Sequence, residues 1–134
     1  MTLLESCASV ALISTSVMLA APSLIKAREN YQLDAVARQV AGKMQSTRIK
    51  AISGYRDYRV RVTSTTSYAI ECEDPAWRAD EIVALPKGFR ITSTATPQFH
   101  LRGNVAPTAT LVVWDKHSRS KRVIVNITGR VRVE

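Results

Sequence analysis

The hydrophobic pattern of the first half of the chain changes near residue 26. Ser6 to Ile25 contains no charged residue, and these 20 positions would span about 30 Å as a helix, close to the hydrocarbon thickness of a bilayer. From Lys26 to about Ser53 the chain is polar, but apolar residues recur mostly at three- and four-residue steps, which is typical of one buried helix face. That face comprises Leu33, Val36, Ala37, Val40, Ala41, Met44, Ile49 and Ile52. The pattern predicts one long helix with a membrane-spanning half and an amphipathic half, which ends at Gly54.

After Gly54 the pattern changes to short runs of alternating and β-branched residues, separated by turn residues, which is typical of strands. The expected strands are 58–62, 67–71, 81–85, 89–93, 98–102, 110–114, 122–127 and 130–133. One long helix followed by many short strands predicts an α+β fold in which the amphipathic half of the helix packs on an antiparallel sheet. We therefore expect a transmembrane segment at residues 1–25 and a soluble domain at residues 26–134.

Charge is unevenly distributed along this chain of 134 residues, whose formal net charge is +8. The balance is +6 over residues 26–61, −4 over residues 62–86 and +7 over residues 87–134. Such segregation suits binding to nucleic acid, to acidic surfaces or to another copy of the chain, and a solvated basic face has the same pattern.

The residues that flank the apolar segment bear on its orientation in a membrane. Glu5 precedes it where a cleavable secretory signal has basic residues, while Lys26 and Arg28 follow it and would place the downstream end in the cytoplasm. A basic leader removed before Met1 would resolve this conflict. Pro22 removes one backbone hydrogen bond and should loosen or kink the helix.

Five segments carry a resemblance to a known family. They are TLLE at Thr2 to Glu5 with the uncharged stretch that contains Pro22, Leu33 to Val62, LPKGFRIT at Leu85 to Thr92, FHLRGN at Phe99 to Asn104, and RVIVNITGRVRV at Arg122 to Val133. Together they resemble the type IV pilins and pseudopilins, in particular the GspH/FimT-type branch.

The resemblance implies a role in filament assembly. In that family a basic leader is cut immediately before residue 1, which is usually Phe and is Met1 here. The apolar helix then anchors the subunit in the inner membrane and later forms the filament core. Glu5 is expected to pair with the N-terminal amine of a neighbouring subunit, because a buried carboxylate and a buried ammonium cost less as a pair than alone. The expected assembly residues are Met1, Glu5 and Pro22.

Basic residues near the C-terminus form a second candidate site. Arg130 and Arg132 are two positions apart, so they share one face of the expected strand, and Lys121 and Arg122 would extend that face. Phosphate contacts by such a patch would give salt-dependent, sequence-tolerant binding to DNA. FimT-type minor pilins of competent bacteria are associated with DNA capture through basic residues at this end. A solvated or subunit-contacting strand is the alternative.

The sequence does not indicate an enzyme, a metal site or a cofactor. It contains no HExxH or GxSxG motif and no glycine-rich phosphate loop. His100 and His117 are expected to face solvent or to have satisfied structural roles. An acidic cluster lacks the ligand number of a calcium loop, so we expect it to be a solvated face, part of which meets the basic helix of a neighbouring subunit. It comprises Glu71, Glu73, Asp74, Asp80 and Glu81.

The sequence thus predicts a structural subunit of a type IV pilus-like or type II secretion pseudopilus filament, built with identical or related pilin subunits. One alternative is a DNA-binding minor pilin at a filament tip. Another is a bitopic membrane protein that presents a binding domain and never assembles. The expected location is the bacterial inner membrane, with the soluble domain in the periplasm, and an extracellular or periplasmic filament.

Overall fold

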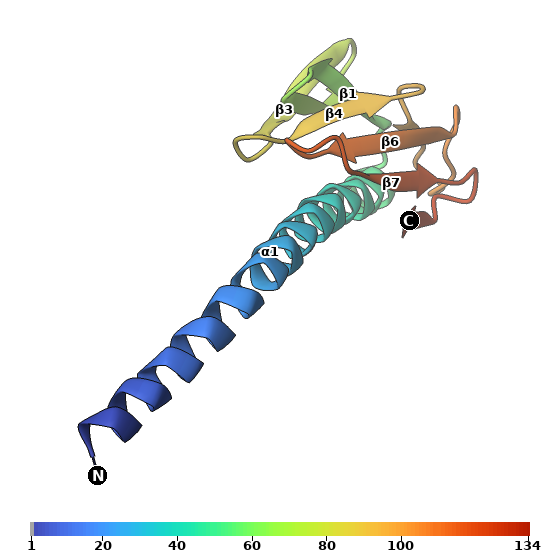
Figure 1. The fold of residues 1–134 in the computed structure, drawn as a ribbon. Helices are drawn as coiled ribbons and strands as arrows, with labels where there is room; N and C mark the ends of the chain where they lie inside the picture. The colour runs from blue at the N-terminus through green and yellow to red at the C-terminus, as the bar shows by residue number, and fades with distance from the viewer. Residues whose placement is uncertain (1) are drawn as a thin grey trace. The chain divides into compact units, whose positions relative to one another are not determined.

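A computed structural model describes residues 2–134 (Figure 1). The chain divides into two compact units, residues 1–32 and Leu33–Glu134, and each is described by itself. The elements are α1 (Leu3–Gly54), β1 (Tyr58–Ser64), β2 (Ser67–Glu73), β3 (Trp77–Ala84), β4 (Arg90–Ser93), β5 (Gln98–Phe99), β6 (Ala109–Trp114), β7 (Ser120–Val125) and β8 (Val131–Val133).

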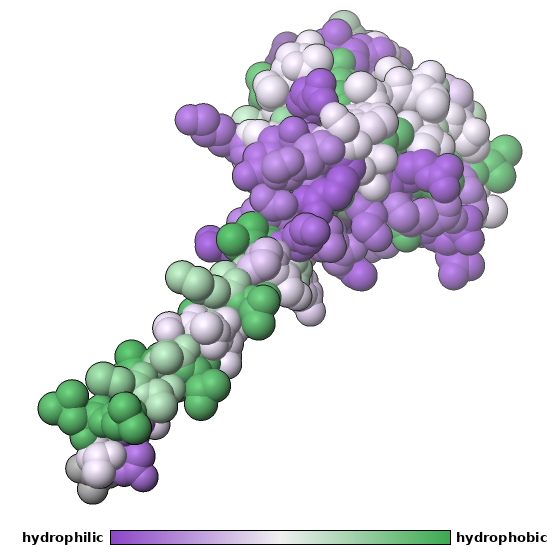
Figure 2. Space-filling view, in the orientation of Figure 1, coloured by the Kyte–Doolittle hydropathy of each residue, from purple (hydrophilic) through white to green (hydrophobic). Residues whose placement is uncertain are grey.

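The N-terminal unit is helical and apolar. The first half of α1 exposes its side chains, and hydrophobic residues gather along it in Figure 2. Part of α1 has a mean hydropathy of 1.8 and is long and apolar enough to cross a membrane. Several of its hydroxyl groups bond back to the preceding turn: Ser9 Oγ donates to the Glu5 carbonyl (2.9 Å) and Ser16 Oγ to the Leu12 carbonyl (2.8 Å). These hydroxyls therefore need no water when the helix enters an apolar medium.

Pro22 lies inside α1, which continues through it. Because proline has no N–H, the Met18 carbonyl loses its usual helix donor at this turn. The loosening expected from the sequence stays a prediction.

The buried face of α1 agrees with the predicted stripe from Leu33 to Met44 and then departs from it. Ile49 and Ile52 were expected to be buried, and this prediction is wrong, since they are 65% and 42% exposed. Thr47 and Ala51 are buried in their place. The cause is helical geometry: at 100° per residue, position 51 returns to within about 20° of Met44, whereas position 49 lies about 140° away.

The C-terminal end of α1 has an unexpected residue in the left-handed conformation. The helix ends at Gly54, as predicted, but the positive φ is at Tyr55 (φ 49°). A tyrosine therefore occupies a backbone conformation that glycine usually takes after a helix.

The strands form two four-stranded antiparallel sheets, with orders β3-β2-β1-β5 and β4-β6-β7-β8 (Figure 1). The α+β fold is confirmed, whereas the strands expected in one sheet are divided between two. The buried residues of α1 share a core with both sheets, to which Tyr68, Ile70, Phe99, Leu111 and Val123 contribute. The expected strand 98–102 is wrong beyond Phe99, because residues 100–103 turn and Gly103 takes φ 86°.

Candidate assembly segment and basic surface

The N-terminus of α1 is closed by a capping box. The Thr2 N–H donates to Glu5 Oε2 (3.0 Å), and the Glu5 N–H donates to Thr2 Oγ1 (3.4 Å). Such reciprocal bonds between positions N-cap and N3 satisfy two helix donors that otherwise lack partners. The Glu5 carboxylate thus has a partner within its own helix. Met1, the other expected assembly residue at this end, lies outside the described residues.

Part of the acidic cluster is a buried ion-pair network rather than the solvated face expected from the sequence. Glu71 is only 4% exposed and pairs with the guanidinium groups of Arg59 and Arg61 from the neighbouring strand. Arg59 also lies 4.2 Å from the ring centroid of Trp77, a cation–π contact. Burial alone would raise the pKa of Glu71, but the two arginines hold it below its ordinary value.

Three further residues of the cluster also have partners within the chain. Lys50 Nζ lies 2.8 Å from Asp80 Oδ2, and Lys43 pairs with Glu81. Asp74 pairs with Arg56 (2.5 Å). Asp80 and Glu81 thus pair with the protein's own helix in the single chain, and their expected contact with the helix of a neighbouring subunit stays a prediction. Within residues 2–134, no group of three or more acidic, histidine or cysteine residues is arranged to hold a metal ion.

The strand register places Arg122 and Arg132 on one face. In β6, Leu111 and Val113 are buried, so Val112 and Trp114 lie on the outer face of the sheet. Arg122 is opposite Val112. Arg132 is opposite Ile124, two positions further along β7 on the same side. Arg90 of β4 is opposite Trp114 and completes a surface that we call the outer basic face: Arg90, Arg122, Arg132 and Trp114.

The other two candidate DNA-binding residues lie elsewhere. Lys121 is opposite the buried Val113, so it faces α1, where its Nζ lies 3.9 Å from Asp34 Oδ1. Arg130 is exposed and precedes β8 beside a groove with α1. Arg132 and Arg122 both share Glu134, at 3.1 and 3.4 Å. The four predicted residues therefore do not form one continuous surface.

Arg48 joins α1 to two glycine turns. Its Nε donates to the Gly103 carbonyl (2.9 Å). Gly129 is buried with φ 80°, and a Cβ there would lie 2.5 Å from Arg48 Nε and even closer to the Gly103 carbonyl oxygen. This junction positions the start of β8 against α1. Three separate parts of the chain build it, so the sequence pattern did not reveal it.

His100 has a structural partner and His117 is exposed, which agrees with the roles expected for them. His100 Nδ1 lies 2.8 Å from Asp57 Oδ2, which also accepts from Gln98 Nε2 (2.9 Å). Burial would raise the pKa of Asp57, but His100, Gln98 and the Leu101 N–H hold it below its ordinary value. Asp57 thereby ties the connection after α1 to β5 and the turn that follows.

Asp115 organises the loop between β6 and β7. It accepts bonds from the His117 and Arg119 N–H groups (2.8 and 2.9 Å) and pairs with the Arg119 side chain. Burial would raise the pKa of Asp115, whereas these bonds lower it. Arg119 is therefore held by the loop and is not free to extend a basic patch.

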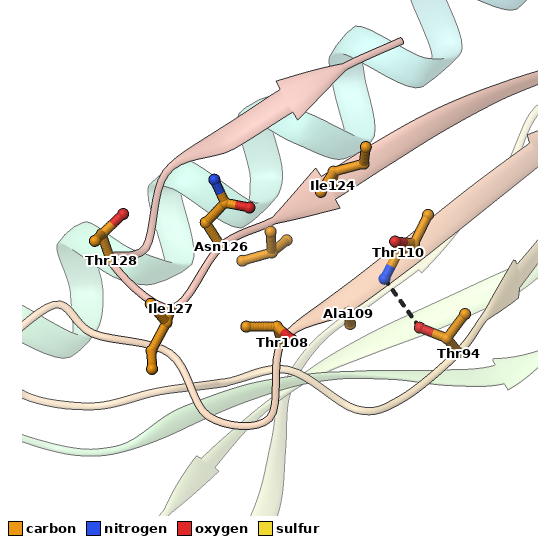
Figure 3. Close-up of a pocket in the computed structure, with 9 residues that line it drawn as sticks. Thr94, Thr108, Ala109, Thr110, Ile124, Asn126, Ile127 and Thr128 are labelled. Atoms are coloured by element: carbon orange, nitrogen blue, oxygen red, sulfur yellow. Dashed lines mark hydrogen bonds between the residues drawn. The ribbon is translucent and has the colours of Figure 1, made fainter.

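A pocket of about 480 Å³ lies at one end of β6 and β7 (Figure 3). Its lining is uncharged and includes Thr94, Thr108, Thr110, Ile124, Asn126, Ile127 and Thr128. The Thr110 N–H donates to Thr94 Oγ1 (3.0 Å) across it. Because the lining carries no cation, the pocket does not suit a phosphate group.

Comparisons with known proteins identify the fold. No protein-family model and no curated protein sequence matches the chain. Among solved structures, the minor pseudopilin EpsH from the type 2 secretion system of Vibrio cholerae is similar, with TM-score 0.66 and 17% identity over 77% of this chain and 96% of that one. The type IV minor pilin FimU of Pseudomonas aeruginosa has TM-score 0.64 and 13% identity over 79% of this chain and 90% of that one.

These similarities show that the chain has a pilin-like fold, shared with a minor pseudopilin and a minor pilin, as the sequence resemblance predicted. One long helix packs through its second half on an antiparallel sheet domain.

Proposed function

We propose that the chain is a structural subunit of a type IV pilus-like or type II secretion pseudopilus filament. The observation that carries the proposal is the exposed apolar half of α1, continuous in one helix with a domain of pilin-like fold. Large apolar side chains on a helix without a protein partner require either lipid or other helices. A filament subunit uses both in turn: the membrane before assembly and neighbouring helices afterwards.

Glu5 supplies the proposed register between subunits. In the isolated chain its carboxylate caps α1 through Thr2. In the filament it would instead pair with the N-terminal amine of a neighbour, because both charges are then withdrawn from water. The capping box thus keeps the carboxylate bonded until assembly offers a cation.

Membrane anchoring is tested with two matched isoleucine variants. Ile13 of the apolar segment and Ile82 of β3 are similarly exposed, at 65% and 69%. Aspartate at the centre of a membrane helix costs about 3 kcal/mol of insertion free energy. We expect Ile13→Asp to move a large share of the chain into the supernatant after alkaline carbonate extraction of membranes. The wild-type chain and Ile82→Asp should stay in the pellet.

The anchoring role is contradicted if carbonate releases the wild-type chain. It is also contradicted if Ile13→Asp and Ile82→Asp have the same distribution.

DNA binding is a second candidate function, and the outer basic face is the observation that favours it. Arg122 and Arg132 share this face with Arg90 and Trp114, so cations and an aromatic ring lie together on an open sheet. Such a surface suits backbone phosphates and a stacked base. Glu134 weakens the attraction of this face for phosphate, because its carboxylate pairs with both Arg122 and Arg132.

The DNA hypothesis predicts salt-dependent binding that depends on this face. The double variant Arg122→Ala/Arg132→Ala should weaken binding of a mixed-sequence duplex at every sequence tested and reduce the salt slope by about one for each phosphate that is no longer neutralised. Fluorescence anisotropy against salt concentration measures both quantities. Lys87→Ala, an exposed cation in another turn, is the control. Equal losses in the control and the double variant would exclude a specific DNA surface.

A further inference from the structure

The free edge of β8 is an open hydrogen-bonding edge. Arg122 and Glu134 exchange two backbone bonds of 2.8 Å, so residues 130, 132 and 134 direct their backbone groups toward β7. Antiparallel geometry then directs the N–H and C=O groups of Val131 and Val133 away from β7. Within the described chain no other strand pairs with this edge. An exposed edge of this kind is a template for a further strand.

A groove runs beside this edge. Its volume is about 530 Å³, and it lies between residues 128–131 and the second half of α1, which contributes Gln45, Arg48, Ile49 and Ile52. The two isoleucines are 65% and 42% exposed, although they continue the helix that builds the core. An added strand beside β8 would cover them with every second side chain.

The charged residues that line the groove favour an acidic partner. Its lining contains two arginines and no carboxylate. In the part of the chain that the structure describes, neither Arg48 nor Arg130 forms an ion pair, and Arg48 uses its Nε on the Gly103 carbonyl. An acidic segment would therefore place its carboxylates against unneutralised cations.

A second copy of the chain is a poor occupant. Pairing two β8 strands would bring Arg130 and Arg132 of one copy against those of the other. The other long open edge is β3, but its Asp80 and Glu81 already pair with Lys50 and Lys43. Glu71 lies in the interior strand β2 and is buried between two arginines.

We propose that the β8 edge and its groove bind an extended acidic segment of a different protein, which adds as a strand beside Val131 and Val133. Alternate apolar side chains of that segment would contact Ile49 and Ile52, and its carboxylates would face Arg130. This site is independent of DNA binding and of the role of Glu5 in assembly.

The test uses the full chain in phosphatidylcholine nanodiscs and a fluorescent eight-residue peptide of alternating valine and glutamate. We expect saturable binding by fluorescence anisotropy at low salt, together with slowed hydrogen exchange at the Val131 and Val133 amides. Arg130→Glu should weaken binding about tenfold, and Ile49→Asp should also weaken it. Lys87→Glu changes net charge equally at a distant turn and should have no effect.

Two control peptides separate strand addition from general attraction. A peptide with lysine in place of glutamate should not bind. One with proline at two alternate positions should bind weakly, since proline cannot donate to a strand ladder. Absence of binding by the acidic peptide, tight binding of the proline peptide, or equal losses in Lys87→Glu and Arg130→Glu would overturn the proposal.

Discussion

Gly129→Ala is expected to destabilise the soluble unit by roughly 3 kcal/mol. The residue has φ 80°, where a side chain is strained, and this alone costs about 1–2 kcal/mol for alanine. The added Cβ would also meet the Gly103 carbonyl and Arg48 Nε, both well inside contact distance. These close contacts can be relieved only if the backbone moves, and such overpacking costs about 1–3 kcal/mol more. The whole Arg48 junction would have to shift.

Gly88→Ala is the matched control for this effect. Gly88 has a similar φ of 92°, but a Cβ there meets nothing within 4 Å. It should therefore lose only the backbone strain of about 1–2 kcal/mol, without the cost of overpacking. Guanidinium unfolding of the full chain in detergent micelles, followed by the fluorescence of Trp77 and Trp114, measures both losses. Equal losses in the two variants would show that the approach of Gly129 to Gly103 and Arg48 is not tight.

Glu5→Gln is expected to abolish filament assembly while leaving the helix cap in place. Glutamine at this position still completes a capping box with Thr2, so the N-terminus of α1 should remain ordered. The charge that would neutralise a neighbour's amine is gone, and an unpaired buried charge costs roughly 3–5 kcal/mol per subunit. Repeated along a filament, that loss should prevent growth. Electron microscopy of sheared filaments gives the readout.

Thr2→Ala is the complementary variant. It removes the hydroxyl that accepts from the Glu5 N–H but keeps the carboxylate. It should cost about 1 kcal/mol of local helix stability and leave assembly intact. If Thr2→Ala stops assembly and Glu5→Gln does not, the cap rather than the charge is the essential function of this motif.

The main elements of the fold could be predicted because their patterns are local. The uncharged run, the six-residue stripe from Leu33 to Met44 and most strands follow directly from residue spacing. The prediction was wrong at Ile49 and Ile52 because it rested on their apolar side chains and not on the helical angle. At these two positions the helix has turned the side chains away from the buried face. The capping box could also have been predicted, because Thr2 and Glu5 have the spacing of its sequence motif. The resemblance to pilins instead assigned Glu5 to a contact between subunits.

The ion pairs and the turn junction could not be predicted, since they depend on pairing between distant segments. Glu71 is buried because β1 brings Arg59 and Arg61 alongside it. Arg48 precedes Gly103 by 55 positions, and only the folded sheets bring the two together. Likewise, Lys121 and Arg122 are adjacent in sequence but lie on opposite faces of β7.

The central claim is that this chain is part of a filament. Mass spectrometry of filaments sheared from cells that produce the chain tests the claim most directly. We predict that the purified filament fraction contains peptides of this chain and that the fraction from Glu5→Gln cells does not. If filaments form with their other subunits while the wild-type chain stays wholly in the inner membrane, the account is contradicted, and a bitopic protein that presents its binding domain without assembling takes its place.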